Sequence, residues 1–159
     1  TIFDKSGESI RFVDDFACIG LFSNCAALYS APDLPATGIR SYCYYQMFYK
    51  CTNLTAAPAL PATALAGSCY AHMFNGCSSL ASAPDLNASS LEQSCYQSMF
   101  NGCSALTSLK TNHRSWLTNN ATASWLNNVS ESGTFYCPAS LPDERGNSRI
   151  PDGWTRVNV

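Results

Sequence analysis

The sequence predicts an α/β solenoid, in which successive copies of one small unit stack into a single elongated domain. Two sets of cysteines recur at the same 26-residue step: Cys25, Cys51, Cys77 and Cys103 in one set, and Cys43, Cys69 and Cys95 in the other. A repeat period between about 20 and 50 residues is typical of stacked-repeat proteins. Hydrophobic residues make up 46% of the 159 residues, which is enough for a packed core.

The same period extends beyond the regular cysteines. An imperfect copy begins at Cys18, where the two cysteines are seven residues apart instead of eight. A further copy, ATASWLNNV, has lost its cysteines and keeps apolar residues in their place: Ala121, Trp125, Leu126 and Val129. Terminal units of a repeat stack commonly depart from the consensus. The sequence therefore predicts about five 26-residue coils over residues 17–133.

Each unit divides into three parts. Ser68 is expected to cap a short helix, CYAHMF, and Asn75-Gly76 is expected to end it with a left-handed residue. The following CSSLASAP predicts a short parallel strand that stops at Pro84, because proline has no amide to donate. A proline-rich return, such as PDLPAT, then leads to the next helix. These parts describe a short leucine-rich-repeat stack.

Caps are predicted at both ends. The alternating segment ESIRFV, within residues 1–16, predicts an N-terminal strand that covers the first coil. We expect strands at GTFYC and TRVNV, and residues 134–159 are predicted to form the C-terminal cap. Phe135, Tyr136 and Trp154 would close the open end of the core there. Such a cap protects the unpaired strand edges of a stack from aggregation.

The chain resembles the BspA-like leucine-rich-repeat proteins of bacterial cell surfaces. The shared features are CYxxMFxGC, SxLxSAPxLPAT and the closing GTFYCP…IPDGWTRVNV, which together cover nearly the whole chain. The resemblance implies a secreted or surface-exposed solenoid from anaerobic gut or oral bacteria, often one part of a longer surface protein. It also implies adhesion to host matrix proteins or cells, and it assigns no catalytic or ligand-binding residue, because the shared motif is core.

Composition argues against several classes of function. The net charge is −2 and only 13% of residues are charged, with no cluster of Lys or Arg. Nucleic-acid binding needs a basic stripe and is not expected. No apolar run approaches the roughly 20 residues of a membrane span, so no transmembrane segment is predicted. A signal peptide is expected to have been removed or to lie upstream of Thr1.

The nine cysteines admit two interpretations. A disulfide framework suits an extracellular protein, but the number is odd and side chains in register point in parallel. We favour free thiols that fill the core as small hydrophobic groups, in a ladder of Cys25, Cys51, Cys77, Cys103, Cys43, Cys69 and Cys95.

Neither a metal site nor a catalytic site is expected. Cys69, His72 and Cys77 could in principle bind zinc, yet the positions equivalent to His72 carry Gln46 and Ser98. Every cysteine is explained by the core pattern, so a Cys–His nucleophile pair is not favoured. Asp14-Asp15 is interpreted as a solvated pair. We therefore predict no enzyme, no cofactor and no metal.

Function is expected to lie on the surface. Tyrosine combines contact area with a polar tip, so a binding surface is predicted at Tyr29, Tyr42, Tyr45 and Tyr49. The predicted function is a non-catalytic extracellular interaction module, secreted or at the bacterial cell surface, for a protein or glycan partner. The alternative is a structural spacer or tip of a larger adhesin or phage-type fibre.

Overall fold

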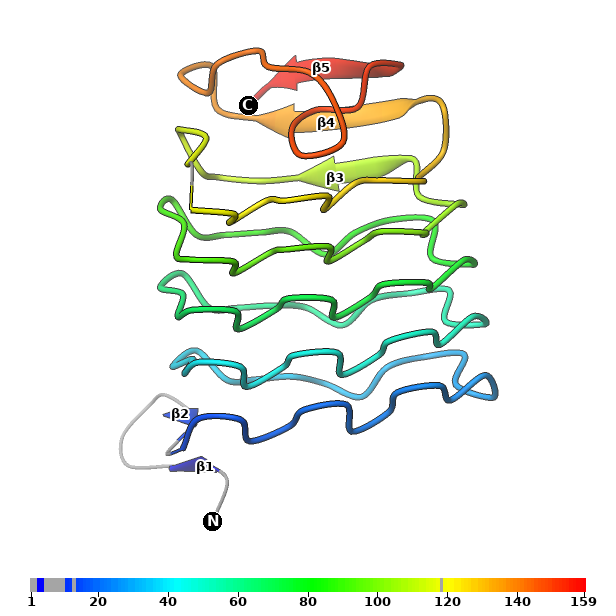
Figure 1. Cartoon of the computed structure of the whole chain (residues 1–159), viewed down its shortest axis with the longest axis vertical. Coiled ribbons are helices and arrows are strands. Elements are labelled where there is room, and N and C mark those ends of the chain that lie inside the picture. The colour runs from blue at the N-terminus through cyan, green and yellow to red at the C-terminus, as the bar shows by residue number, and fades with distance from the viewer. Residues whose placement is uncertain (1–2, 5–10, 13, 118) are drawn as a thin grey trace.

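The protein winds in successive circuits that lie one above another from the N-terminal to the C-terminal end (Figure 1). The structure is a computed structural model, and it describes residues 3–4, 11–12, 14–117 and 119–159. We call each circuit a rung. Along one side of every rung the chain follows a zigzag of tight turns, and the return path on the other side is extended.

Regular strands are short and lie at the two ends. At the N-terminal end β1 (Phe3–Asp4) pairs antiparallel with β2 (Arg11–Phe12). At the C-terminal end a parallel three-stranded sheet has the order β3-β4-β5, with bounds of Ser108–Lys110, Gly133–Cys137 and Trp154–Asn158. Its register pairs Leu109 with Phe135 and Phe135 with Arg156.

The zigzag side is built from consecutive β-turns. Every second backbone amide donates a hydrogen bond to the carbonyl three residues earlier and so closes a turn, as Tyr45 does to Tyr42 at 3.2 Å. The amides between them donate to carbonyls of the next rung. Each of these carbonyls lies one residue less than a full 26-residue repeat further along the chain, as from Tyr44 to Cys69 at 3.0 Å. Turn bonds and bonds between rungs therefore alternate along the chain, and we call these segments (16–25, 42–51, 68–77, 94–103 and 120–128) the turn ribbon.

Every fourth residue of the turn ribbon has a positive φ. In one rung these residues are Ser68 (54°), His72 (57°) and Gly76 (80°), and the same positions recur in the other rungs. A type II β-turn requires a positive φ at its third residue, which glycine adopts without steric cost. Most of these positions carry residues other than glycine, so their backbone is locally strained. The hydrogen bonds between neighbouring rungs offset the cost of this strain.

The predicted α/β solenoid of about five leucine-rich-repeat coils is wrong. No helix is present among the described residues, and CYAHMF lies in the turn ribbon instead. An α-helix needs negative φ throughout and amides that bond four residues back along the same segment. A helix of six residues is marginal by itself, whereas the adjacent rung supplies carbonyls for half of the amides.

The predicted strand in each unit is also wrong for most rungs. In the return paths, single parallel bridges such as Ser30 to Ala56 and Ser82 to Ser108 replace a continuous ladder. Among the described units that contain the motif of the predicted strand, only the one at Ser108–Lys110 forms a regular strand, the three residues of β3. The prolines that begin the return leave no ladder amide at their positions. By contrast, the strands predicted at GTFYC and TRVNV agree with β4 and β5, while the predicted N-terminal strand is described only at β2.

The core consists of side chains stacked from rung to rung. One column contains Tyr44, Tyr70 and Tyr96, whose neighbouring ring centroids are 5.8 and 6.0 Å apart. A second column contains Phe22, Phe48, Phe74 and Phe100, with neighbouring rings 5.5–5.6 Å apart and nearly parallel. Offset stacking of this kind adds to the free energy gained by burying the rings. The columns hold the surface of the ribbon in fixed register.

The two ends of the stack differ. At the C-terminal end the loop after β4 covers the last rung: Leu126 donates to the Asn147 carbonyl at 3.3 Å, and Trp125 Nε1 donates to the Arg149 carbonyl at 2.9 Å. Trp154 is buried there with Phe135, as the sequence predicts, while Tyr136 is half-buried.

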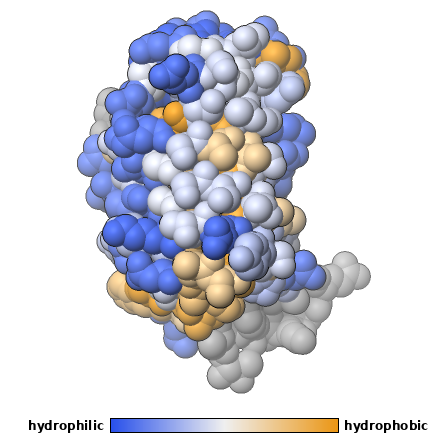
Figure 2. Space-filling model, turned by 90° about the vertical axis from the view of Figure 1, so that its right-hand side faces the viewer, coloured by the Kyte–Doolittle hydropathy of each residue, from blue (hydrophilic) through white to orange (hydrophobic). Residues whose placement is uncertain are grey.

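At the N-terminal end, no described residue pairs with the outer edge of the first turn-ribbon segment. Among the described residues, no hydrogen bond reaches the carbonyls of Ile19, Leu21 and Ser23, the positions that accept amides in every later rung. Ile19 and Leu21 also expose their side chains. Figure 2, a view of the side where each rung bends back, shows apolar residues gathered at this lower end of the stack.

Candidate binding surface

Four rings form a continuous row across three rungs of the turn ribbon. Phe16 stacks on Tyr42 with ring centroids 5.0 Å apart, Tyr42 lies 5.6 Å from Tyr45, and Tyr45 meets His72 edge-on at 5.5 Å. Phe16 is 57% exposed and Tyr42 is 37% exposed. We call Phe16, Tyr42, Tyr45 and His72 the aromatic row.

The aromatic row follows from the 26-residue step. Phe16 lies one full repeat before Tyr42, and His72 lies one full repeat after Gln46. The prediction from sequence includes Tyr42 and Tyr45 but misses Phe16, which it assigns to a cap, and His72, which it interprets as a variable surface position. Extending the step backward from Tyr42 identifies Phe16.

A polar groove borders the aromatic row. It has a volume of about 460 Å³ and is lined by residues of three consecutive rungs. The first of these rungs contributes Tyr42 and Tyr45, and the third contributes Gln93 and Gln97. The rung between them carries Gly67, which has no side chain and leaves space. Volumes of roughly 300–1,000 Å³ are common for small-molecule sites.

The middle rung is fixed in place by its backbone. Tyr42 donates its amide to the Gly67 carbonyl at 3.1 Å, and Ser68 donates to the Gln93 carbonyl at 2.9 Å. A Cβ added at Gly67 would have the Gln93 carbonyl oxygen 3.8 Å away, which is ordinary contact. The groove therefore results from small residues in a rigid rung.

Apart from tyrosine, His72 is the only titratable side chain among the described residues that line the groove. Its Nδ1 lies 3.2 Å from Asn75 Nδ2, so that nitrogen accepts a hydrogen bond from the amide. Burial lowers the pKa of His72 from its ordinary value of 6.5. The ring is therefore neutral at neutral pH, and none of the described residues that line the groove is an Asp, Glu, Lys or Arg.

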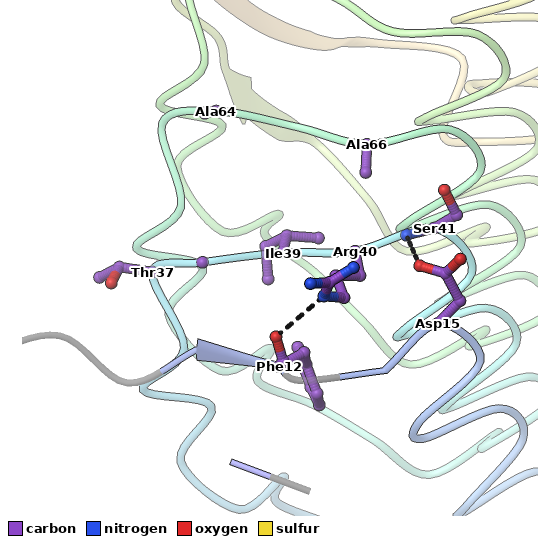
Figure 3. Close-up of a pocket in the computed structure, with 9 residues that line it drawn as sticks. Phe12, Asp15, Thr37, Ile39, Arg40, Ser41, Ala64 and Ala66 are labelled. Atoms are coloured by element: carbon purple, nitrogen blue, oxygen red, sulfur yellow. Dashed lines mark hydrogen bonds between the residues drawn. The ribbon is translucent and has the colours of Figure 1, made fainter. Parts of the chain in front are cut away.

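A second hollow, of about 700 Å³, adjoins the groove at Ser41 (Figure 3). Its charged groups have structural partners: Arg40 Nε donates to the Phe12 carbonyl at 3.2 Å, and Asp15 Oδ1 accepts the Ser41 amide at 3.2 Å. Both bonds attach the N-terminal segment to the second rung. We therefore interpret this hollow as a structural junction, with Asp15 engaged on one side.

The remaining predicted surface residues lie apart from the row. Tyr29 is 64% exposed on a return path, and no ring contact to it occurs among the described residues. Tyr49 is half-buried, and the Lys50 ammonium lies 5.2 Å from its ring centroid. The structure thus brings together two of the four predicted tyrosines, Tyr42 and Tyr45.

Six of the seven ladder cysteines are buried: Cys43, Cys51, Cys69, Cys77, Cys95 and Cys103. The thiols of Cys51, Cys77 and Cys103 donate to phenylalanine carbonyls of the preceding rung at 3.0–3.1 Å. Cys25 is exposed, contrary to its place in the predicted core ladder, because among the described residues no rung covers the first one on that side. All nine cysteines are free thiols in the structure.

The residues considered for metal binding do not converge. Cys77 bonds to a backbone carbonyl, Cys69 is buried, and His72 faces Tyr45 and Asn75. Within the described part of the chain, no group of three or more His, Cys, Asp or Glu side chains is placed to hold a metal ion. Asp14 and Asp15 are exposed.

His113, the other histidine, is enclosed by tryptophans. It is 1% exposed, its Nδ1 lies 2.6 Å from Thr111 Oγ1, and its ring packs edge-on against Trp116 and Trp125. Its Nε2 has no hydrogen-bond partner among the described residues. A substrate cannot reach this imidazole without local unfolding, so we regard it as part of the core.

The described residues include no helix with the length and apolar character that crossing a bilayer requires. Comparison of the chain with protein-family models, with curated proteins and with solved structures found no match.

Proposed function

We propose that the chain is a non-catalytic interaction module that binds a protein or glycan partner through the aromatic row. The observation that carries the proposal is the exposure of Phe16 and Tyr42, stacked rings held on a rigid stack of rungs. Rings fixed in this way bury a large contact area on binding and lose little conformational entropy. Such residues commonly dominate the binding free energy of an interface.

The histidines support a non-catalytic role. A nucleophilic cysteine needs a base within hydrogen-bond reach. His72 Nδ1 contacts Asn75, and His113 is buried against Thr111. Burial also raises the pKa of Cys77 to about 12, which keeps that thiol protonated and unreactive at neutral pH.

A secreted or bacterial cell-surface location belongs to the same proposal. It is supported by the resemblance of CYxxMFxGC and GTFYCP to the BspA-like surface proteins. The low fraction of charged residues, 13%, is compatible with adhesion by aromatic and neutral polar groups.

Surface immobilisation of the protein tests the proposal. The immobilised chain is exposed to a panel of extracellular-matrix proteins and to a glycan array, and capture is measured for the wild type, Phe16→Ala, Tyr42→Ala and Tyr29→Ala. We expect the wild type to capture at least one partner, and we expect this capture to fall at least tenfold in Phe16→Ala and in Tyr42→Ala. Tyr29→Ala is the matched control, since it removes a ring outside the row that is more exposed than either Phe16 or Tyr42. The proposal would be contradicted if the wild-type chain captured no member of the panel, or if all three variants lost capture equally.

A second candidate function is a structural spacer or tip in a larger adhesin or phage-type fibre. The open carbonyl edge at Ile19, Leu21 and Ser23 favours it, because this edge can accept the amides of another polypeptide segment. Sedimentation velocity tests the candidate: a trimer or a longer assembly supports it. A monomer at all concentrations, combined with specific capture of a partner, argues for the interaction module instead.

A further inference from the structure

The two sides of the polar groove differ in chemistry. On the side of the first contributing rung, Tyr45 lines the groove, and its ring lies between those of Tyr42 and His72. On the other side, Gln93 and Gln97 present primary amides. Each amide can donate and accept hydrogen bonds at the same time.

This pairing of surfaces suits a sugar ring. The C–H face of a pyranose is apolar and packs on an aromatic ring, while its hydroxyl groups are both donors and acceptors. Ser68 of the middle rung and Ser94, next to Gln93, also line the groove and add hydroxyl groups. A phenolic or aliphatic ligand would leave the amides and hydroxyls without partners, at a cost for each polar group removed from water.

The charge of the groove limits the ligand further. Its described lining residues include no Asp, Glu, Lys or Arg, and the His72 imidazole among them is neutral at neutral pH because burial lowers the His72 pKa. A sulfated or carboxylated ligand would find no counter-charge within the groove. The chemistry therefore favours an uncharged ligand.

We propose that the groove between Tyr45 and Gln97 is a binding site for neutral saccharides. This proposal rests on the proposed function and narrows it to one ligand class at one site. The groove is shallow and open to solvent, so binding of a short oligosaccharide is expected in the millimolar range, and avidity would strengthen the capture of a polymer.

Titration followed by NMR tests the site directly. Neutral probes (chitotriose, cellotriose, maltotriose and N-acetyllactosamine) and acidic probes (sialyllactose and a heparin tetrasaccharide) are added to the ¹⁵N-labelled full chain up to about 20 mM, a range set by the millimolar affinity expected. At least one neutral probe is expected to shift the amide of Gly67 and the side-chain amides of Gln93 and Gln97. The indole signal of Trp154, at the C-terminal end, serves as an internal reference.

Three variants locate the binding. Gly67→Leu fills the groove from its floor, where a Cβ has room. Gln97→Ala removes one amide, and Tyr29→Ala is the control outside the groove. We expect affinity to fall at least tenfold in Gly67→Leu and several-fold in Gln97→Ala, with no change in Tyr29→Ala. Because Gln97 is half-buried outside the core columns, its variant keeps the test valid should Gly67→Leu perturb the rung.

Three results would overturn the saccharide site. These are the absence of shifts with every neutral probe, shifts with acidic probes only, and affinity unchanged in both groove variants. Failure of this site is distinguishable from failure of the proposed function. If a protein partner is captured through Phe16 and Tyr42 while Gly67→Leu has no effect, the interaction module stands and the saccharide site does not.

Discussion

At the scale of single residues, the same position in the repeat has different consequences in different rungs. Cys77 is fully buried and donates its thiol to the Phe48 carbonyl at 3.1 Å. Cys25, two repeat steps before it in the same register, is exposed. A thiol that is buried and protonated reacts slowly, because the thiolate is the nucleophile.

Alkylation should therefore separate these cysteines. We expect iodoacetamide at neutral pH to modify Cys25 in the folded protein and all nine cysteines after denaturation, as counted by mass spectrometry. In an equilibrium unfolding experiment, Cys77→Ala should lower the free energy of unfolding by about 1–2 kcal/mol, because packing and a hydrogen bond are lost. Cys25→Ala is the control and should change it by less than about 0.5 kcal/mol. Rapid native alkylation of Cys77 would contradict its burial.

His113 predicts a dependence of stability on pH. Burial, with the nearby Arg149 charge, lowers the pKa of His113 from 6.5 to about 4. Between these values the unfolded chain binds more protons than the folded one, so stability rises with pH in this window. The contribution is full above pH 6.5 and is lost as the pH falls toward 4, by about 3 kcal/mol for this shift.

Urea unfolding between pH 4 and 7.5 measures this effect. The wild type should lose stability over the acidic half of the range, and His113→Gln should flatten the profile. His72→Gln is the control for the other histidine, since glutamine occupies the equivalent position at Gln46. A profile that His113→Gln leaves unchanged would assign the titration to another group.

At the scale of elements, the turn ribbon depends on residues that tolerate a positive φ. Gly102 has a φ of 79°, and a Cβ added there would meet no atom closer than 3.5 Å. A substitution at Gly102 therefore tests conformation separately from steric contact. Gly67 offers the matched case, since it carries no positive φ and its added Cβ also has room.

Alanine at these two glycines should have opposite effects. Gly102→Ala is expected to destabilise the protein by about 1–2 kcal/mol, the cost of a left-handed non-glycine residue. Gly67→Ala is expected to be neutral or to stabilise by up to about 1 kcal/mol, because it reduces the entropy of the unfolded chain. Thermal and chemical denaturation give both values. Equal changes in the two variants would show that the ribbon does not impose its φ at Gly102.

At the scale of the whole molecule, the two ends of the stack are unequal. Trp154 is 2% exposed and donates its Nε1 to the Ser130 carbonyl at 2.9 Å. Leu21, at the opposite end, is 61% exposed. The C-terminal end therefore contributes burial to stability, while the N-terminal end leaves apolar surface and carbonyl groups in water.

Truncation at each end should reflect this inequality. We expect Trp154→Ala to lower the free energy of unfolding by about 3–5 kcal/mol, as is usual for a buried tryptophan. Leu21→Ala should change it by less than about 0.5 kcal/mol. Guanidinium unfolding followed by circular dichroism provides the comparison. A large loss in Leu21→Ala would mean that the first rung is covered in solution.

The candidate surface is partly predictable from sequence. Tyr42 and Tyr45 are identified because tyrosine combines contact area with a polar tip, and the structure places their ring centroids 5.6 Å apart. Phe16 is missed because its rung begins two residues before the first cysteine, Cys18. The polar groove could not be predicted, since it depends on Gly67 lying between Tyr45 and Gln97 in space.

The sequence by itself determined the 26-residue period, the apolar positions that fill the core, and the strands β4 and β5. Only the tertiary structure decided the conformation of CYAHMF. A helix and a turn ribbon both bring residues four positions apart to one face, so a segment of six residues has the same apolar pattern in either form. The choice rests on carbonyls of the neighbouring rung, almost one full repeat away along the chain, which accept half of the ribbon's amides. Such partners exist only after the chain has stacked.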